Sequence, residues 1–225
     1  MKTTLRTALI MMVAFALMMG TGWAKKKMSK SGFLSDFSKL EEGKKGQAEF
    51  VYFKEGVNWK SYDKIMIDYL VFFMDKDAEY KGIQADELNE IANTWHKAFM
   101  EALKEDYEIV LEPGPGVLRI RAAITDLSPT KPGINTITTV LPVGLAVSIF
   151  KKGATGAGTG VGKVTTEAEI LDSSTNEVLV AAIDFKAGQK YRVDKMMSKW
   201  GHVRVAIESW AKSLHDRLQE FSGKR

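Results

Sequence analysis

The chain has 225 residues and contains no cysteine. This absence excludes disulfide frameworks, thiol nucleophiles, iron–sulfur clusters and cysteine zinc sites. It also excludes the lipid-bearing cysteine through which bacterial lipoproteins are anchored. The stability of the folded protein must therefore come from packing.

Histidine is also scarce, with three residues in the whole chain. His202 and His215 lie 13 positions apart, so they do not form the adjacent-turn pair that a metal site on a helix would use. His96 lies next to Trp95 in a different segment. We therefore expect no metal site and no cofactor.

Recognisable catalytic motifs are absent as well. The chain has no Gly-x-Ser-x-Gly elbow, and no pair of carboxylates stands out. Asp68, Asp126 and Asp184 are each equally typical of strand ends or turns. We expect the protein not to be an enzyme.

The first 24 residues have the pattern of a secretory signal peptide. Lys2 and Arg6 form a basic start, the apolar run Ala8–Met19 follows, and small residues precede a cleavage point after Ala24. The apolar run has about 12 residues, whereas a membrane-spanning helix needs about 20. We therefore expect residues 1–24 to be removed and the mature chain to be periplasmic.

Loss of Lys2 and Arg6 with the signal leaves 30 basic and 28 acidic residues, a net charge of +2. This nearly neutral charge argues against nucleic-acid binding. So do the expected export and the lack of a stripe of basic and aromatic residues. A cluster of lysines at residues 25–30 remains. It is either a solvated tail or a contact with anionic lipid headgroups at the membrane surface.

Residues 25–48 form a basic and polar N-terminal leader with a small apolar island at Phe33–Leu40. We expect this leader to lie on the domain rather than to belong to its core. Residues 49–225 are long enough for one α/β domain.

Two segments have the spacing of amphipathic helices. In Ala85–Lys104, apolar residues recur every three or four positions from Leu88 to Ala102. From Trp200 to Phe221, a second stripe includes Trp210. Both helices are expected to cover the sheet.

Apolar runs rich in β-branched residues predict the strands. Tyr62–Phe73 has the pattern of a single central strand buried on both faces. The alternation in Val117–Leu127 predicts a strand with one partly wet face, and Ser173–Asn176 predicts a hairpin turn between two runs. Further strands are expected at Phe50–Phe53, Tyr107–Leu111, Val164–Asp172 and Glu177–Phe185.

The order of strand, helix, strand, strand, hairpin and helix predicts a two-layer α/β (α+β-like) sandwich. It consists of a mixed sheet with two main amphipathic helices packed on it. The first strand–helix–strand unit is expected to be a right-handed parallel crossover, and the later strands to be largely antiparallel.

A glycine-rich stretch, Gly153–Gly162, precedes Lys163 and superficially resembles a phosphate-binding loop. Such a loop needs a glycine where Ala157 stands and Ser or Thr where Val164 stands. The dinucleotide pattern also fails, because a strand rather than a helix is expected to follow. We expect no nucleotide binding.

The apolar segment Ile137–Phe150 is interrupted by Pro142 and Gly144 and is too short to span a membrane. It is either a buried element that closes the core or a flap that contacts a membrane or a partner protein. The candidate contact residues are Leu141, Val143, Leu145, Ile149, Phe150, Lys151 and Lys152.

Four segments carry a resemblance to a known family: SGFLSDFSKL from Ser31, VNWKSYDKIMID from Val57, EPGPGVLRIRAAITDL from Glu112 and EAEILDSSTNEVLVAAID from Glu167. Together they resemble the bacterial envelope family catalogued as domain of unknown function thirty-three thirteen. The resemblance covers essentially the whole mature chain. Members are usually outer-membrane lipoproteins of unknown activity, so it implies an envelope location and no reaction. The lipid-bearing cysteine of such members is missing here.

The sequence therefore favours an exported, non-catalytic module that binds an envelope protein or a membrane surface. One alternative is a protein that binds a small apolar ligand or lipid, with Ile137–Phe150 and the sheet enclosing the cavity. Another is an unrecognised envelope hydrolase. The oligomeric state is left open.

Overall fold

The computed structural model describes Met28 and residues 30–75, 82–129, 147–150, 162–187 and 199–223, with Asp75 and 147–150 described by their backbone alone. The expected signal peptide, 1–24, lies outside these residues, and its cleavage after Ala24 stays a prediction. Within the described part of the chain, no helix is long and apolar enough to cross a membrane.

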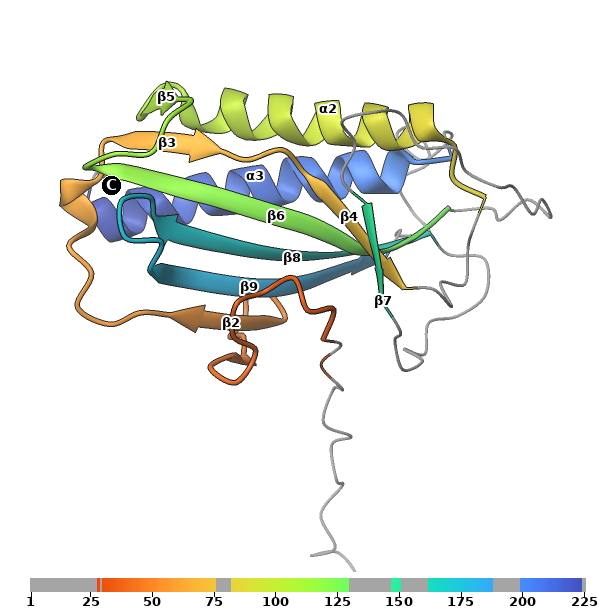
Figure 1. Cartoon of the computed structure of the whole chain (residues 1–225), viewed down its shortest axis with the longest axis horizontal. Coiled ribbons are helices and arrows are strands. Elements are labelled where there is room, and N and C mark those ends of the chain that lie inside the picture. The colour runs from red at the N-terminus through yellow and green to blue at the C-terminus, as the bar shows by residue number, and fades with distance from the viewer. Residues whose placement is uncertain are drawn as a thin grey trace, which may run out of the picture.

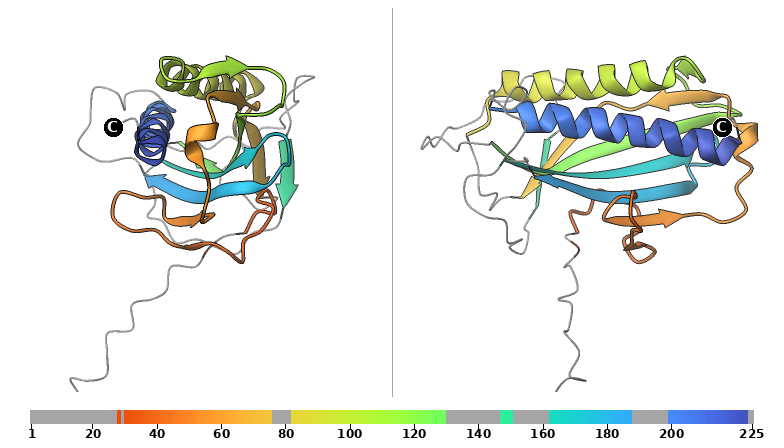
Figure 2. Two further views of the ribbon diagram at one scale, coloured as in Figure 1. Left: turned by 90° about the vertical axis from the view of Figure 1, so that its left-hand side faces the viewer. Right: turned by 180° about the vertical axis from the view of Figure 1, so that it is seen from behind.

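The described residues form two layers, a nine-stranded mixed sheet and two long helices on one of its faces (Figures 1 and 2). This is the predicted two-layer α/β arrangement. The helices are α2 (Ala85–Leu103) and α3 (Gly201–Ser222), and a short 3-10 turn, η1, spans Trp59–Ser61. The strands are β1 (Glu41–Glu42), β2 (Phe50–Phe53), β3 (Lys64–Ile67), β4 (Val71–Asp75), β5 (Glu108–Val110), β6 (Val117–Ser128), β7 (Val147–Phe150), β8 (Lys163–Asp172) and β9 (Val178–Ala187).

The strands follow the order β1-β2-β9-β8-β6-β3-β5, and β4 joins β6 to β7. Strand β3 runs parallel to β5 and β6, which confirms the parallel pairing predicted for the first strand–helix–strand unit. The long β6–β8–β9 meander and β2 are antiparallel, as predicted. Strand β7, in contrast, pairs with β4 in parallel.

The prediction of one continuous strand over Tyr62–Phe73 was wrong. Ile67 pairs with Ile120 and Val71 with Ala123 of β6, so four steps along this chain face three steps along its partner. One extra residue is therefore accommodated between β3 and β4, as in a bulge. The break cannot be recognised from the sequence, because the run is apolar on both sides of it.

The side chains at this break have three different environments. Asp68 accepts hydrogen bonds from the Nε and Nη2 atoms of Arg119 on β6, at 3.0 and 2.7 Å. Tyr69 is 88% exposed, whereas Leu70 is buried. An ion pair and an outward-facing ring thus separate two strands that both pair with β6.

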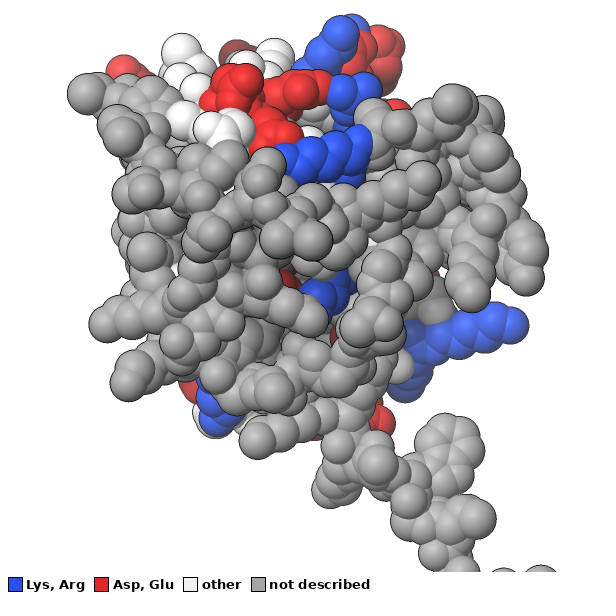
Figure 3. Space-filling model, turned by 90° about the vertical axis from the view of Figure 1, so that its right-hand side faces the viewer, with Lys and Arg blue, Asp and Glu red and all other residues white. Residues whose placement is uncertain are grey.

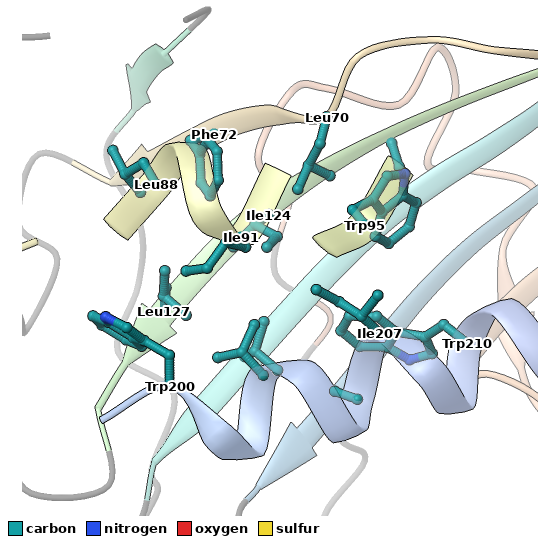
Figure 4. Close-up of a cluster of buried hydrophobic side chains, with 14 of the residues drawn as sticks. Leu70, Phe72, Leu88, Ile91, Trp95, Ile124, Leu127, Trp200, Ile207 and Trp210 are labelled. Atoms are coloured by element: carbon teal, nitrogen blue, oxygen red, sulfur yellow. The ribbon is translucent and has the colours of Figure 1, made fainter. Parts of the chain in front are cut away.

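Both helices direct an apolar stripe toward the sheet. The stripe of α2 runs from Leu88 to Leu103, and a capping box between Gln84 and Glu87 satisfies backbone donors at its start. Figure 4 shows side chains from α2, α3, β4 and β6 converging in this inner core, with Ile207 and Trp210 of α3 facing Trp95 of α2.

The other face of the sheet is covered by the N-terminal segment, which lies opposite the helices in Figure 2. We call Ser31–Leu40 the strap. Its Phe33, Leu34 and Leu40 pack against Phe50, Ala123, Ala181 and Ile183 in a separate apolar cluster. The strap does lie on the domain, as expected, but it also completes a second small core.

The partly wet face predicted for β6 is confirmed. Arg119 and Arg121 keep about a third of their side chains exposed, whereas Ala123, which belongs to the strap cluster, is buried. Asp126 and Ser128, at the far end of the strand, are half-buried, so the buried part of this face lies in the middle of the strand.

Candidate functional site

Most of the contact residues predicted from the sequence lie outside the described part of the chain: Leu141, Val143, Leu145, Lys151 and Lys152. Ile149 and Phe150 belong to β7, where they pair with Met74 and Asp75 of β4. The end of the apolar segment is therefore a strand. Whether its preceding part acts as a flap stays a prediction.

A pocket of about 470 Å³ lies between α3 and the helix-covered face of the sheet. Its walls come from β2, β8, β9 and α3, and Trp95 and Phe99 of α2 contribute two stacked rings with centroids 4.0 Å apart. Whether Ile137–Phe150 also borders an apolar cavity stays a prediction.

Strands β8 and β9 line the pocket with paired residues whose size and polarity change along its length. Ile170 pairs with Val180, then Ala168 with Ala182, then Thr166 with Asp184. All six line the pocket. Two alanines in the middle leave room between strand and helix, and the two ends differ in polarity.

Helix α3 runs along the same axis. Trp210 lies beside Asp184, to which its Nε1 donates a hydrogen bond of 2.7 Å. At the other end Phe221 packs edge-on against Phe53, with ring centroids 5.5 Å apart, and Phe53 pairs with Val180. The lining of α3 from residue 209 to 221 covers about 18 Å at 1.5 Å per residue, so the pocket is elongated.

A polar stripe of α3 borders the mouth. Ser209, Ser213 and Arg217 recur every four residues and line the pocket, and both serines are exposed. Arg217 donates a hydrogen bond of 3.3 Å to the carbonyl oxygen of Gly46 and forms an ion pair of 2.9 Å with Glu220. Arg217 thereby connects α3 to the loop of residues 46–48, which also lines the pocket.

Asp184 organises the polar end. Its carboxylate accepts hydrogen bonds from Trp210 and from the backbone N–H of Glu49, at 2.7 and 3.2 Å, and pairs with Lys186 Nζ at 2.8 Å. Three donors, from α3, from β9 and from the residue before β2, therefore surround this buried acid, which is how a buried charge is normally stabilised.

Two further buried acids, Glu167 and Glu169, lie on the opposite face of β8, and the sequence analysis missed them. Each is 1% exposed. Glu167 accepts hydrogen bonds from the backbone N–H and the hydroxyl of Ser31, at 3.3 and 2.5 Å. Glu169 accepts the same two bonds from Ser35, at 2.6 and 3.1 Å. These two acids hold the strap on the sheet, and because they are buried they are not accessible to a substrate.

The titratable groups with shifted pKa values have structural explanations. Burial, followed by a hydrogen bond to Asp172, raises the pKa of Tyr62 to about 12. Burial lowers the pKa of His202. His202 lies so close to Gly162 that a Cβ on this glycine would be 2.5 Å from the imidazole Cε1, so the last glycine of the predicted loop is required by packing.

In the described ranges, no three His, Asp or Glu side chains gather in a way that could hold a metal ion. At the end where α3 begins, described acidic and basic side chains lie side by side (Figure 3). Ion pairs join Lys199, just before α3, to Glu87 of α2 at 2.8 Å, and Arg204 of α3 to Glu90 of α2.

A family model described as "Protein of unknown function (DUF3313)" matches residues 29–214. The chain belongs to this family. The predicted resemblance is therefore confirmed. A curated relative, the uncharacterized lipoprotein YdcL of Escherichia coli, is 24% identical over 184 residues, which cover 80% of this chain and 81% of YdcL.

Solved structures with a related arrangement are more distant. The PelC dodecamer from Paraburkholderia phytofirmans is 12% identical, with a TM-score of 0.40 over 72% of this chain and 96% of that one. A DUF4136 family protein from Bacteroides thetaiotaomicron is 11% identical, with a TM-score of 0.38 over 73% and 94%. At these scores the likeness adds nothing to the site.

Proposed function

We propose that this protein is a non-catalytic envelope protein that binds an apolar chain in the pocket between α3 and the sheet. The observation that carries the proposal is the pocket itself. Its volume of about 470 Å³ falls within the range of about 300–1,000 Å³ that is typical of small-molecule sites. The signal-peptide pattern of residues 1–24 and the lipoprotein relative support the envelope location.

The exposure of the central alanines supports binding at this place. Ala168 and Ala182 face two helices, yet neither is fully buried. Interiors normally pack as densely as organic crystals, so open space beside two alanines under a helix is unusual. A ligand would fill this space and remove its apolar lining from water, at about 25 cal/mol for each Å² covered.

The test measures the binding of dodecanoate to the purified mature protein. Titration calorimetry gives the affinity, and native mass spectrometry detects the bound chain. In the variant Ala182→Leu, the added side chain occupies the middle of the pocket, so binding should fall at least about tenfold, a difference near 1.4 kcal/mol. Ala187→Leu is the matched control, because it makes the same change at an exposed end of the same strand.

The control variant should bind as the unaltered protein does. Thermal melts of both variants check that they fold. Absence of binding to the unaltered protein, or equal binding by Ala182→Leu, would contradict the proposal. Binding to lipid vesicles without uptake of single chains would favour a membrane-surface role for residues 137–152 instead.

A further inference from the structure

The pocket has a direction, because its two ends differ in chemistry. One end is formed by Ile170, Val180, Leu218 and the aromatic pair Phe53 and Phe221. The other is formed by Thr166, Asp184, Lys186 and Ser209. From Val180 to Lys186 the distance is about 20 Å at 3.3 Å per residue, so the gradient extends along the length of the pocket.

We infer that the ligand is a single acyl chain with an anionic oxygen head group. The head group lies at the Lys186 end of the pocket, and the tail points toward Phe53 and Phe221. This inference rests on the proposed function and specifies its ligand. Fatty carboxylates and lysophospholipids share this chemistry.

Lys186 is the group that selects the charge of the head. Its side chain is 42% exposed while Asp184 beside it is 10% exposed, so the ammonium lies at the opening and the carboxylate lies beneath. An ammonium carries three N–H donors, and one ion pair leaves donors for a second anion. Asp184 already accepts hydrogen bonds from Trp210 and Glu49 as well, so a cationic head would compete with three existing donors for this carboxylate.

The other cation of the pocket, Arg217, is placed differently. It is joined to both Glu220 and the Gly46 carbonyl, and it lies one helical turn from Phe221, where the lining is apolar. Arg217 therefore holds the loop at residue 46. Arg217→Met tests the reverse orientation of the chain, because Arg217 is the second cation that lines the pocket, with an exposure similar to that of Lys186.

The experiment compares dodecanoate, dodecanol and dodecylammonium by titration calorimetry at low salt. Dodecanoate should bind about 1.5- to 5-fold tighter than dodecanol, the range expected for one partly exposed charge pair, and dodecylammonium should bind weakest. The preference should shrink as salt is added. Lysophosphatidylglycerol, tested in parallel, distinguishes a phosphodiester head from a carboxylate.

In Lys186→Met, dodecanoate and dodecanol should bind equally, whereas Lys186→Arg should keep the preference and Arg217→Met should leave it unchanged. Thermal melts confirm that each variant is folded. Equal binding of all three heads by the unaltered protein would overturn the charge assignment and leave the proposed function standing. Loss of the preference in Arg217→Met but not in Lys186→Met would overturn the orientation. If no chain binds, both the inference and the proposed function fail.

Discussion

The two faces of the sheet are closed by different means, and neighbouring residues of β9 show the difference. Ala181 faces the strap and is 2% exposed. Ala182 faces α3 and remains partly accessible, because the pocket lies beside it. At this position of β9, the short strap thus closes its side of the sheet more tightly than α3 closes the other.

The physical reason lies in backbone hydrogen bonding. A helix satisfies its own N–H and C=O groups, so α2 and α3 need only apolar contacts with the sheet and can leave space between them. The strap has no regular ladder for its backbone, and buried N–H groups need acceptors. Glu167 and Glu169 supply these acceptors to Ser31 and Ser35, and they thereby fix the strap in one position.

The largest effect is expected where the inner face is fully packed. Phe72 is 0% exposed, and Phe72→Ala should lower the free energy of unfolding by about 3–5 kcal/mol, the usual cost of emptying an aromatic site in a core. Tyr69→Ala is the matched control, because this ring is 88% exposed; it should change stability by less than about 0.5 kcal/mol. Denaturant melts measure both, and equal effects would contradict the inner core described above.

A smaller effect is expected on the strap side. Glu169→Ala removes the acceptor of the Ser35 N–H and hydroxyl, which should cost about 1–3 kcal/mol for an unsatisfied polar group. Hydrogen exchange should show faster exchange at Ser35 and unchanged protection in α2. Glu177→Ala, at an exposed position of the β8–β9 turn, is the control and should leave the strap protected. Unchanged exchange at Ser35 would show that the strap does not depend on this acid.

A third effect depends on pH and arises at the start of α3. Burial holds the pKa of His202 below the usual 6.5. Below pH 6.5 the unfolded chain takes up a proton that the native state still rejects, so the free energy of unfolding falls as the pH is lowered through this value. Above pH 6.5 both states are neutral and His202 contributes no dependence.

Melts between pH 7.5 and pH 5 should therefore show a decline in stability that is shallower in His202→Gln. The slopes are compared rather than the absolute stabilities, because the substitution also alters packing against Gly162. Identical slopes in the two proteins would refute this assignment.

The smallest effect is expected on the solvent side of α3. Lys212 and Asp216 form an ion pair of 2.5 Å one turn apart, with the lysine side chain 73% exposed. Exposed pairs of this kind contribute little, so Lys212→Ala should change the free energy of unfolding by less than about 0.5 kcal/mol. A loss above 1 kcal/mol in denaturant melts would mean that the outer side of α3 has a structural role.

The sequence predicted the elements of the fold well, because their signals are periodic and local. The stripe that contains Trp210 located α3, and Ser173–Asn176 located the hairpin. The break near Asp68 was missed because a bulge adds one residue without changing the apolar composition of the run.

The candidate site was harder to predict, because it depends on pairing between segments. The pocket exists where Ala168 meets Ala182 across two strands, and neither alanine is informative alone. Glu167 and Glu169 alternate with inward residues and have the pattern of a solvent face. Only the strap, distant in sequence, makes them buried. Serines in SGFLSDFSKL that recur four positions apart were the one available signal.

The most direct test of the central claim, that the inner face is the open and ligand-binding side, is hydrogen exchange with and without dodecanoate. We expect slower exchange in α3 from residue 209 to 221 and in β9 when dodecanoate is added, with exchange in the strap unchanged. Protection that appears in Ser31–Leu40 and not in α3 would place the ligand on the opposite face and would contradict the account.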